Sequence, residues 1–66
     1  MNNISNYITK GYSEASVVAY PQNSISVIAK IMKEIDLATI PVMESPWNKK
    51  IIGIIKYDMI KNFVVE

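Results

Sequence analysis

The run Ile51-Ile52-Gly53-Ile54-Ile55 constrains the fold more than any other feature of the sequence. Its β-branched residues favour a strand. Side chains alternate between the two faces of a strand, so this run is apolar on both, and both faces have to be covered. The chain has 66 residues, enough for one domain with a thin core. We therefore expect a second chain to cover what this one leaves exposed.

The clearest helix is predicted for residues 25–35, where apolar residues recur with a helical period. The face predicted to be buried consists of Ile25, Ile28, Ala29, Met32 and Ile35, joined by Ile31. Asn23 or Ser24 stands just before this segment, and either side chain can accept a hydrogen bond from the first free backbone N–H groups. The sequence thus marks both the start of this helix and its core side.

Two other short runs favour strands. Val17–Tyr20 is β-prone and is stopped by Pro21, while Ile40–Met43 contains Pro41, which belongs at the start or on the edge of a strand. Turn-forming residues fill 44–50, so this segment is predicted to connect two strands. Met32 and Met43 are predicted to fill the core, and Met59 to lie at a helix–helix contact.

The two ends of the chain have weaker patterns. Ile4, Tyr7 and Ile8 permit one or two helical turns before Gly11, so residues 1–16 are predicted to form an N-terminal extension with a short helix. Apolar residues at 60, 63 and 64 predict a last helix, and Asp58 suits the dipole of its first turn. Residues 17–66 thus read strand, helix, strand, strand, helix. We expect an α/β unit with two or three strands, helices on one side, and an exposed apolar face that pairs with a second copy.

Composition excludes several functions. Histidine and cysteine are absent and there are only two glycines, so a common general base, a thiolate nucleophile, a metal site and a glycine-rich phosphate loop are not expected. We predict that the chain is not an enzyme. Its net charge is +1, its seven basic residues are all lysines spread along the chain, and no arginine occurs, which argues against nucleic-acid binding. No apolar run is long enough to cross a bilayer and no signal peptide is evident, so a cytoplasmic protein is expected.

Four segments together resemble one repeat of the cystathionine-β-synthase (CBS) domain family. They are Val17–Ile25, the helix to Met32, Ile40–Val42 and Ile51–Ile55, and the resemblance covers about residues 17 to 64. It implies a β-α-β-β-α unit, two of which pack into a disc-like pair with clefts that commonly bind adenosine nucleotides. Such units act as regulatory modules, either attached to enzymes, channels and transporters or as small stand-alone proteins.

The resemblance also implies which residues face a ligand. Thr39 and Pro41 fall where the family lines the adenine side of the cleft. After Gly53, Ile54 and Ile55 the family has Thr or Ser and then Asp, but here these positions hold Lys56 and Met59. The nearby Asp58 is one residue early, and one residue turns a helical side chain by about 100°. The candidate ligand-binding residues are therefore Thr39, Pro41, Lys56 and Asp58.

Simpler interpretations stay open for each candidate. Lys56 is also consistent with an exposed lysine that ends a strand, and Asp58 with a carboxylate favoured by the helix dipole alone. Thr39 would then be a loop residue, and Pro41 would shape the strand entry. Trp47 is either an exposed aromatic anchor for another protein or a side chain that folds back over its own hairpin, and we favour the second.

The sequence therefore predicts a regulatory, ligand-binding CBS-type module that forms a homodimer. Its cleft would take an adenosine nucleotide or another small anion, with AMP, ATP or S-adenosylmethionine as regulatory ligands and no cofactor. One alternative is an adaptor that dimerises without a ligand, which would explain the missing Thr or Ser and Asp. Another is a fragment of a longer tandem-CBS protein that regulates an enzyme or transporter.

Overall fold

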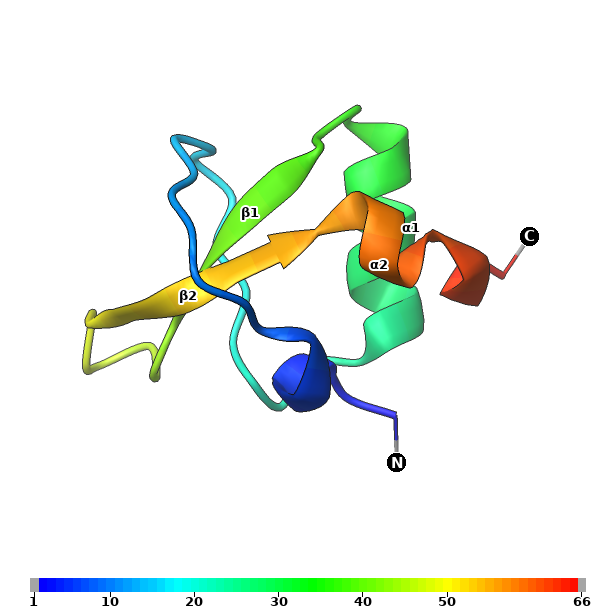
Figure 1. Ribbon diagram of the computed structural model, residues 1–66. Helices are drawn as coiled ribbons and strands as arrows, with labels where there is room; N and C mark the ends of the chain where they lie inside the picture. The colour runs from blue at the N-terminus through cyan, green and yellow to red at the C-terminus, as the bar shows by residue number, and fades with distance from the viewer. Residues whose placement is uncertain (1, 66) are drawn as a thin grey trace.

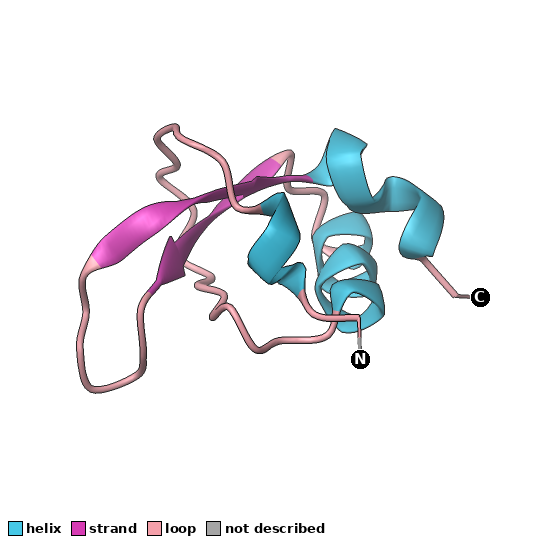
Figure 2. Cartoon of the chain, turned by 60° about the horizontal axis from the view of Figure 1, so that its bottom comes forward, coloured by secondary structure: helices cyan, strands magenta, loops and turns pink. Residues whose placement is uncertain are grey.

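The computed structural model describes residues 2–65. In chain order its elements are the 3₁₀ helix η1 (Ile4–Tyr7), the helix α1 (Ile25–Glu34), the strands β1 (Thr39–Met43) and β2 (Ile51–Lys56), the helix α2 (Tyr57–Ile60) and the 3₁₀ helix η2 (Lys61–Phe63). These elements confirm the coarse prediction of a small mixed α/β fold. Figures 1 and 2 show α1, α2 and η2 at one end of the molecule, while the turn between β1 and β2 projects from the other.

The sheet is an antiparallel hairpin of β1 and β2, extended by one residue on each edge. Thr39 lies opposite Lys56 in the hairpin. On the free edge of β1, Ala19 forms a parallel bridge to Val42, and on the free edge of β2, Thr9 forms an antiparallel bridge to Ile54. Backbone groups that the hairpin alone would leave unpaired thus find partners in the N-terminal third of the chain.

The predicted strand at residues 17–20 is wrong in extent, because only Ala19 pairs. Its N–H donates to the Pro41 carbonyl and its carbonyl accepts from the Met43 N–H, each at 3.0 Å. The next N–H, of Tyr20, donates instead to the Asn23 side-chain oxygen at 2.7 Å, and the Asn23 N–H donates back to the Tyr20 carbonyl at 2.9 Å. This turn draws the chain away from β1 after a single bridge.

The same turn corrects the predicted helix cap. Asn23 uses its side-chain oxygen on Tyr20, and Ser24, although it is the N-cap residue, makes no side-chain cap bond. The Ser24 hydroxyl instead lies 3.1 Å from that of Ser26. α1 therefore begins where the sequence predicts, but without the predicted capping bond.

The body of α1 confirms the predicted periodicity, and its end does not. Four of the predicted core residues on α1, Ile25, Ile28, Ala29 and Met32, are buried, whereas Ile35 is 47% exposed. The helix ends because Asp36 adopts a left-handed conformation with φ of 57°. The Leu37 N–H then donates back to the Met32 carbonyl at 2.9 Å, as in a Schellman motif. Leu37 rather than Ile35 turns toward the core.

The core joins α1 to one face of the hairpin, here named the inner face. Its buried members outside α1 are Ile4, Ala19, Ile40, Val42, Ile55 and Ile60. Ile4 comes from η1, so the N-terminal extension contributes directly to the core. The ring of Tyr7 also meets that of Phe63 edge to face, with centroids 5.7 Å apart. Met59, by contrast, is exposed, so its predicted helix contact does not occur within the chain.

Candidate functional site

The face of the hairpin opposite the core, here named the outer face, is crossed by the chain itself. Alternation along the strands places Thr39, Pro41 and Ile54 on this face, since Ile40, Val42 and Ile55 point into the core. Residues 10–18, here named the strap, run from the Thr9 bridge at the edge of β2 to the Ala19 bridge at the edge of β1. Figure 1 shows this segment passing across β2 before it returns alongside β1.

Two glycines let the strap lie close to the sheet. A β-carbon on Gly53 would lie 2.6 Å from the Thr9 carbonyl oxygen, and one on Gly11 would lie 2.5 Å from the Cδ1 atom of Ile54. Both distances are too short for real contacts. The residues before the strap can therefore approach β2 only because Gly53 has no side chain, whereas a side chain at Gly11 would have to displace the flexible end of Ile54. With the strap in place, Pro41 and Ile54 are buried, so the outer face is less open than the sequence predicts.

Between the strap and β1 the outer face contains a hollow of about 260 Å³, here named the outer hollow. Its lining residues are Gly11, Tyr12, Ser13, Glu14, Ala15, Val18, Pro41, Met43 and Ile51. Tyr12, at the rim, is 80% exposed, and Ile51 is half-exposed. Apolar groups make up most of the wall, with hydroxyls and one carboxylate contributed by the strap.

Three of the four candidate ligand-binding residues lie on or beside this face. Pro41 forms part of the wall of the outer hollow. Thr39 precedes it on β1 and binds the strap, because its hydroxyl donates to the Ser13 hydroxyl at 3.0 Å while the Ser13 hydroxyl lies 3.3 Å from the Thr39 carbonyl oxygen. Lys56 lies opposite Thr39 in the hairpin and is exposed. A cation and two hydroxyls thus stand at one end of the outer face.

Asp58, the fourth candidate, lies apart from this group. Its side chain is 89% exposed and its carboxylate oxygen is 3.8 Å from the Lys61 ammonium, one turn further along the chain. Such an exposed pair contributes little to stability. Here the geometry favours the simpler interpretation of Asp58 as a surface residue in the first turn of α2.

The strap residues that line the outer hollow were not among the predicted site residues. Tyr12, Ser13 and Glu14 follow Gly11 in a stretch with no periodicity, which the sequence indicates only as a loop. Their position depends on the Thr9 and Ala19 bridges, which pair residues more than twenty positions apart in the chain. No local pattern could have indicated them.

Trp47 contradicts the prediction that it folds back over its hairpin, because its side chain is 88% exposed. The turn that carries it is nonetheless closed by side-chain hydrogen bonds. The Asn48 N–H donates to the Ser45 hydroxyl at 2.9 Å, and the Asn48 side-chain amide donates to the Glu44 carboxylate at 2.7 Å. These bonds hold the indole at the projecting end of the molecule, away from the core.

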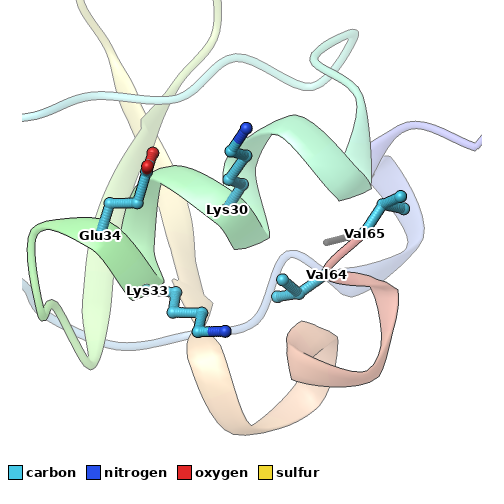
Figure 3. Close-up of a pocket in the computed structure, with 5 residues that line it drawn as sticks. All are labelled: Lys30, Lys33, Glu34, Val64 and Val65. Carbon is cyan, nitrogen blue, oxygen red and sulfur yellow. The ribbon is translucent and has the colours of Figure 1, made fainter.

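A second hollow of about 360 Å³ lies between α1 and the C-terminal residues. Figure 3 shows its lining residues, with Lys30 and Glu34 projecting from one side of α1 and Lys33 extending toward the segment that carries Val64 and Val65. All three charged side chains are exposed. Among the residues that the structure describes, no buried polar group and none of the predicted site residues lines this hollow.

Within residues 2–65, no three side chains of the metal-binding types gather closely enough to hold a metal ion. None of the helices in the same range combines the length and the apolar character needed to cross a bilayer. Comparisons with protein-family models, with curated proteins and with solved structures find no match to this chain.

Proposed function

We propose that this chain is a ligand-binding regulatory module of the CBS type, which pairs with a second copy through its outer face. The order of the elements supports this proposal. The Ala19 bridge, α1, β1, β2 and α2 follow one another as do the strands and helices of the β-α-β-β-α unit that the sequence resembles. The parallel pairing of Ala19 with β1 provides the position that a first strand would take.

The observation that carries the proposal is the size and position of the outer hollow. At about 260 Å³ it falls below the ~300–1,000 Å³ typical of pockets that enclose a small molecule. Its rim carries the exposed ring of Tyr12 and the half-exposed Ile51, which are apolar groups left in contact with water. A second copy packed against this rim would cover both side chains and supply the missing wall.

The chemistry around the outer hollow suits a ligand with a flat apolar part and an anionic part. Pro41 and the Tyr12 ring can sandwich or border a planar base. The Lys56 ammonium lies toward one end, where it can bind a phosphate or carboxylate, while the Ser13 and Thr39 hydroxyls beside it are used to hold the strap to β1. No carboxylate stands where the family holds the ribose, so we expect modest affinity for AMP or ATP, with S-adenosylmethionine as a further candidate.

Thermal unfolding with and without each of these three compounds tests the proposal. A ligand present at 100 times its dissociation constant should stabilise the fold by about 2.7 kcal/mol, which raises the midpoint of so small a domain by about 10–20 °C. The Tyr12→Ala and Lys56→Ala variants should unfold at nearly the unliganded midpoint of the parent, since both side chains are exposed, but should lose most of the shift. The absence of a shift with all three compounds would contradict the nucleotide-binding part.

An adaptor that pairs without a ligand is a second candidate, favoured by Trp47. An exposed tryptophan on a hydrogen-bonded turn is typical of the residues that dominate binding between proteins. Sedimentation velocity distinguishes the two functions. A dimer that forms equally with and without nucleotide, and whose midpoint no nucleotide changes, would favour the adaptor, while a monomer at every concentration would argue against both forms of pairing.

A further inference from the structure

The turn between β1 and β2, residues 44–50 and here named the hairpin tip, carries apolar residues at its apex. Figures 1 and 2 show the tip projecting from the end of the molecule opposite the helices. The Glu44 N–H donates to the Lys50 carbonyl at 2.9 Å, which closes the base of the tip. A second backbone bond across the turn encloses Pro46 and Trp47. These two residues therefore form the apex, and both are exposed, Trp47 to 88%.

Two lysines stand one step behind this apex. Lys49 and Lys50 lead the chain from the apex back to β2, and both are exposed. Within residues 2–65, neither ammonium pairs with a carboxylate. The acidic side chain of the tip, Glu44, accepts instead from the Asn48 side-chain amide at 2.7 Å. The hairpin tip thus has an apolar apex and, behind it, a base with one positive charge in excess.

This order of groups matches the layers of a bilayer surface that contains anionic lipids. Tryptophan is enriched at membrane–water interfaces, because its ring is apolar while its N–H still needs a polar partner. Lysines near such a surface are attracted by the charge of the headgroups, and their long side chains can extend to reach it. A tip that enters apex first would place the indole in the interface and both ammonium groups among the headgroups.

The shape of the hairpin tip favours a lipid surface over a protein surface. Residues that dominate binding between proteins lie near the centre of a contact, where surrounding side chains exclude water. A standard interface also buries ~800 Å² on each partner, which is more than a short projecting turn offers. A bilayer surface is fluid, so it can surround a projecting side chain without a matching shape.

We propose that the hairpin tip binds the surface of membranes that contain anionic lipids, with Trp47 in the interface and Lys49 and Lys50 on the headgroups. Binding to a membrane surface needs no helix that spans it. The net charge of the chain is only +1, so the attraction depends on where these two lysines lie. None of residues 44–50 lines the outer hollow, so the inference does not depend on the proposed function.

Trp47 is the only tryptophan of the chain, so its fluorescence reports directly on the hairpin tip. The protein is titrated with vesicles of equal parts phosphatidylserine and phosphatidylcholine, and separately with vesicles of phosphatidylcholine alone. The mixed vesicles should move the emission to shorter wavelengths. They should also bind about 25-fold more tightly than the neutral vesicles, since each lysine near an anionic surface contributes about fivefold. Added salt should reverse the shift.

Variants assign the binding to the hairpin tip. Lys49→Gln and Lys50→Gln should each weaken binding to the mixed vesicles about fivefold. Lys30→Gln removes the same charge from exposed α1 at the other end of the molecule, so it is the matched control and should change binding little. Trp47→Ala, measured by co-sedimentation with vesicles, should bind at least about tenfold more weakly. Its unfolding midpoint should stay close to that of the parent, because the side chain is exposed.

The absence of a shift with both kinds of vesicle would overturn the inference. Equal weakening by Lys30→Gln and Lys49→Gln, or unchanged vesicle binding by Trp47→Ala, would overturn it as well. A shift with soluble polyglutamate but not with the mixed vesicles would also contradict it, and would show that the tip binds an acidic protein instead. These titrations contain no nucleotide, so their result and that of the nucleotide experiment fail separately.

Discussion

The two faces of the β1–β2 hairpin are covered in different ways. On the inner face, Ile40, Val42 and Ile55 are completely buried against α1 and make no contact with water. On the outer face, the strap lies close to Ile54 at Gly11 and leaves the outer hollow between itself and β1. The inner face therefore provides most of the stability, while the outer face combines a loosely covered surface with exposed aromatic and polar groups.

This difference indicates where function can be added without loss of the fold. A close-packed core tolerates little change, because every methylene removed leaves a cavity. The strap is held by two short bridges and by the hydroxyl bond between Ser13 and Thr39, so it can adjust to a ligand or to a second copy.

Ile55→Ala should have the largest effect because Ile55 lies at the centre of the inner face. Loss of a fully buried isoleucine costs about 2–5 kcal/mol, a large part of the stability of a domain this small. We expect the variant to be largely unfolded, as measured by circular dichroism and urea unfolding. Ile52→Ala, which truncates a half-exposed isoleucine on the same strand, is the matched control. Equal losses from the two would contradict the difference between the faces.

Gly53→Ala should separate the Thr9 bridge, where the strap begins, from the edge of β2 while the core remains folded. The new methyl group would lie 2.6 Å from the Thr9 carbonyl oxygen, a backbone atom that can move only with its chain. We expect a loss of about 1–3 kcal/mol and faster hydrogen exchange at the Thr9 and Ile54 amides. Gly11→Ala meets only the end of the Ile54 side chain, so it should cost less. A larger loss of stability in Gly11→Ala than in Gly53→Ala would contradict the assignment of the tighter contact to Gly53 and Thr9.

Thr39→Val should loosen the far end of the strap. The substitution keeps the shape of the side chain but removes the hydroxyl that donates to Ser13. The expected loss is about 1 kcal/mol, because the Ser13 hydroxyl keeps the Thr39 carbonyl as its acceptor. Denaturant unfolding measures it, with Ser13→Ala as the reciprocal change. Losses that simply add in the double variant would show that the two hydroxyls do not interact.

Tyr12→Ala should change stability by less than about 0.5 kcal/mol, because the ring is almost wholly exposed. Its effect should appear only in pairing and ligand binding, which sedimentation and nucleotide titration measure. A Tyr12→Ala protein that is strongly destabilised would show that the strap belongs to the core. A stable variant with unchanged pairing and binding would remove Tyr12 from the site.

Much of the inner face could be predicted from the sequence, because local patterns determine it. The helical period predicts α1 to within a residue, and the apolar runs predict β1 and β2. Two predictions at the edges of the inner face are wrong, the strand at residues 17–20 and the burial of Ile35. In both cases a local hydrogen bond or backbone conformation overrides the apolar pattern. Asn23 bonds Tyr20 and shortens the predicted first strand to Ala19, and Asp36 ends α1 so that Leu37 packs where Ile35 was expected.

The outer face could be predicted only in part. The family resemblance offers Thr39, Pro41 and Lys56 as candidate ligand-binding residues, and the hairpin register brings them to one end of this face. The sequence does not predict the position of the strap, because its path depends on two long-range pairings, Thr9 with Ile54 and Ala19 with Val42. The prediction that Trp47 packs on its hairpin is wrong. The hydrogen bonds within its turn hold the indole at the projecting end, where no surface of the chain lies beneath it.

Whether the outer face is the binding face is tested by mapping, residue by residue, where AMP and a second copy bind. Amide resonances of the labelled protein are followed as AMP is added, and separately as the protein is concentrated. If the outer face is the binding face, the largest changes fall on residues 11–15 of the strap and on Met43, Ile51 and Lys56, while the amides of Ile40 and Ile55 stay nearly constant. Changes confined to other surfaces, or none at millimolar AMP and protein, would contradict the account.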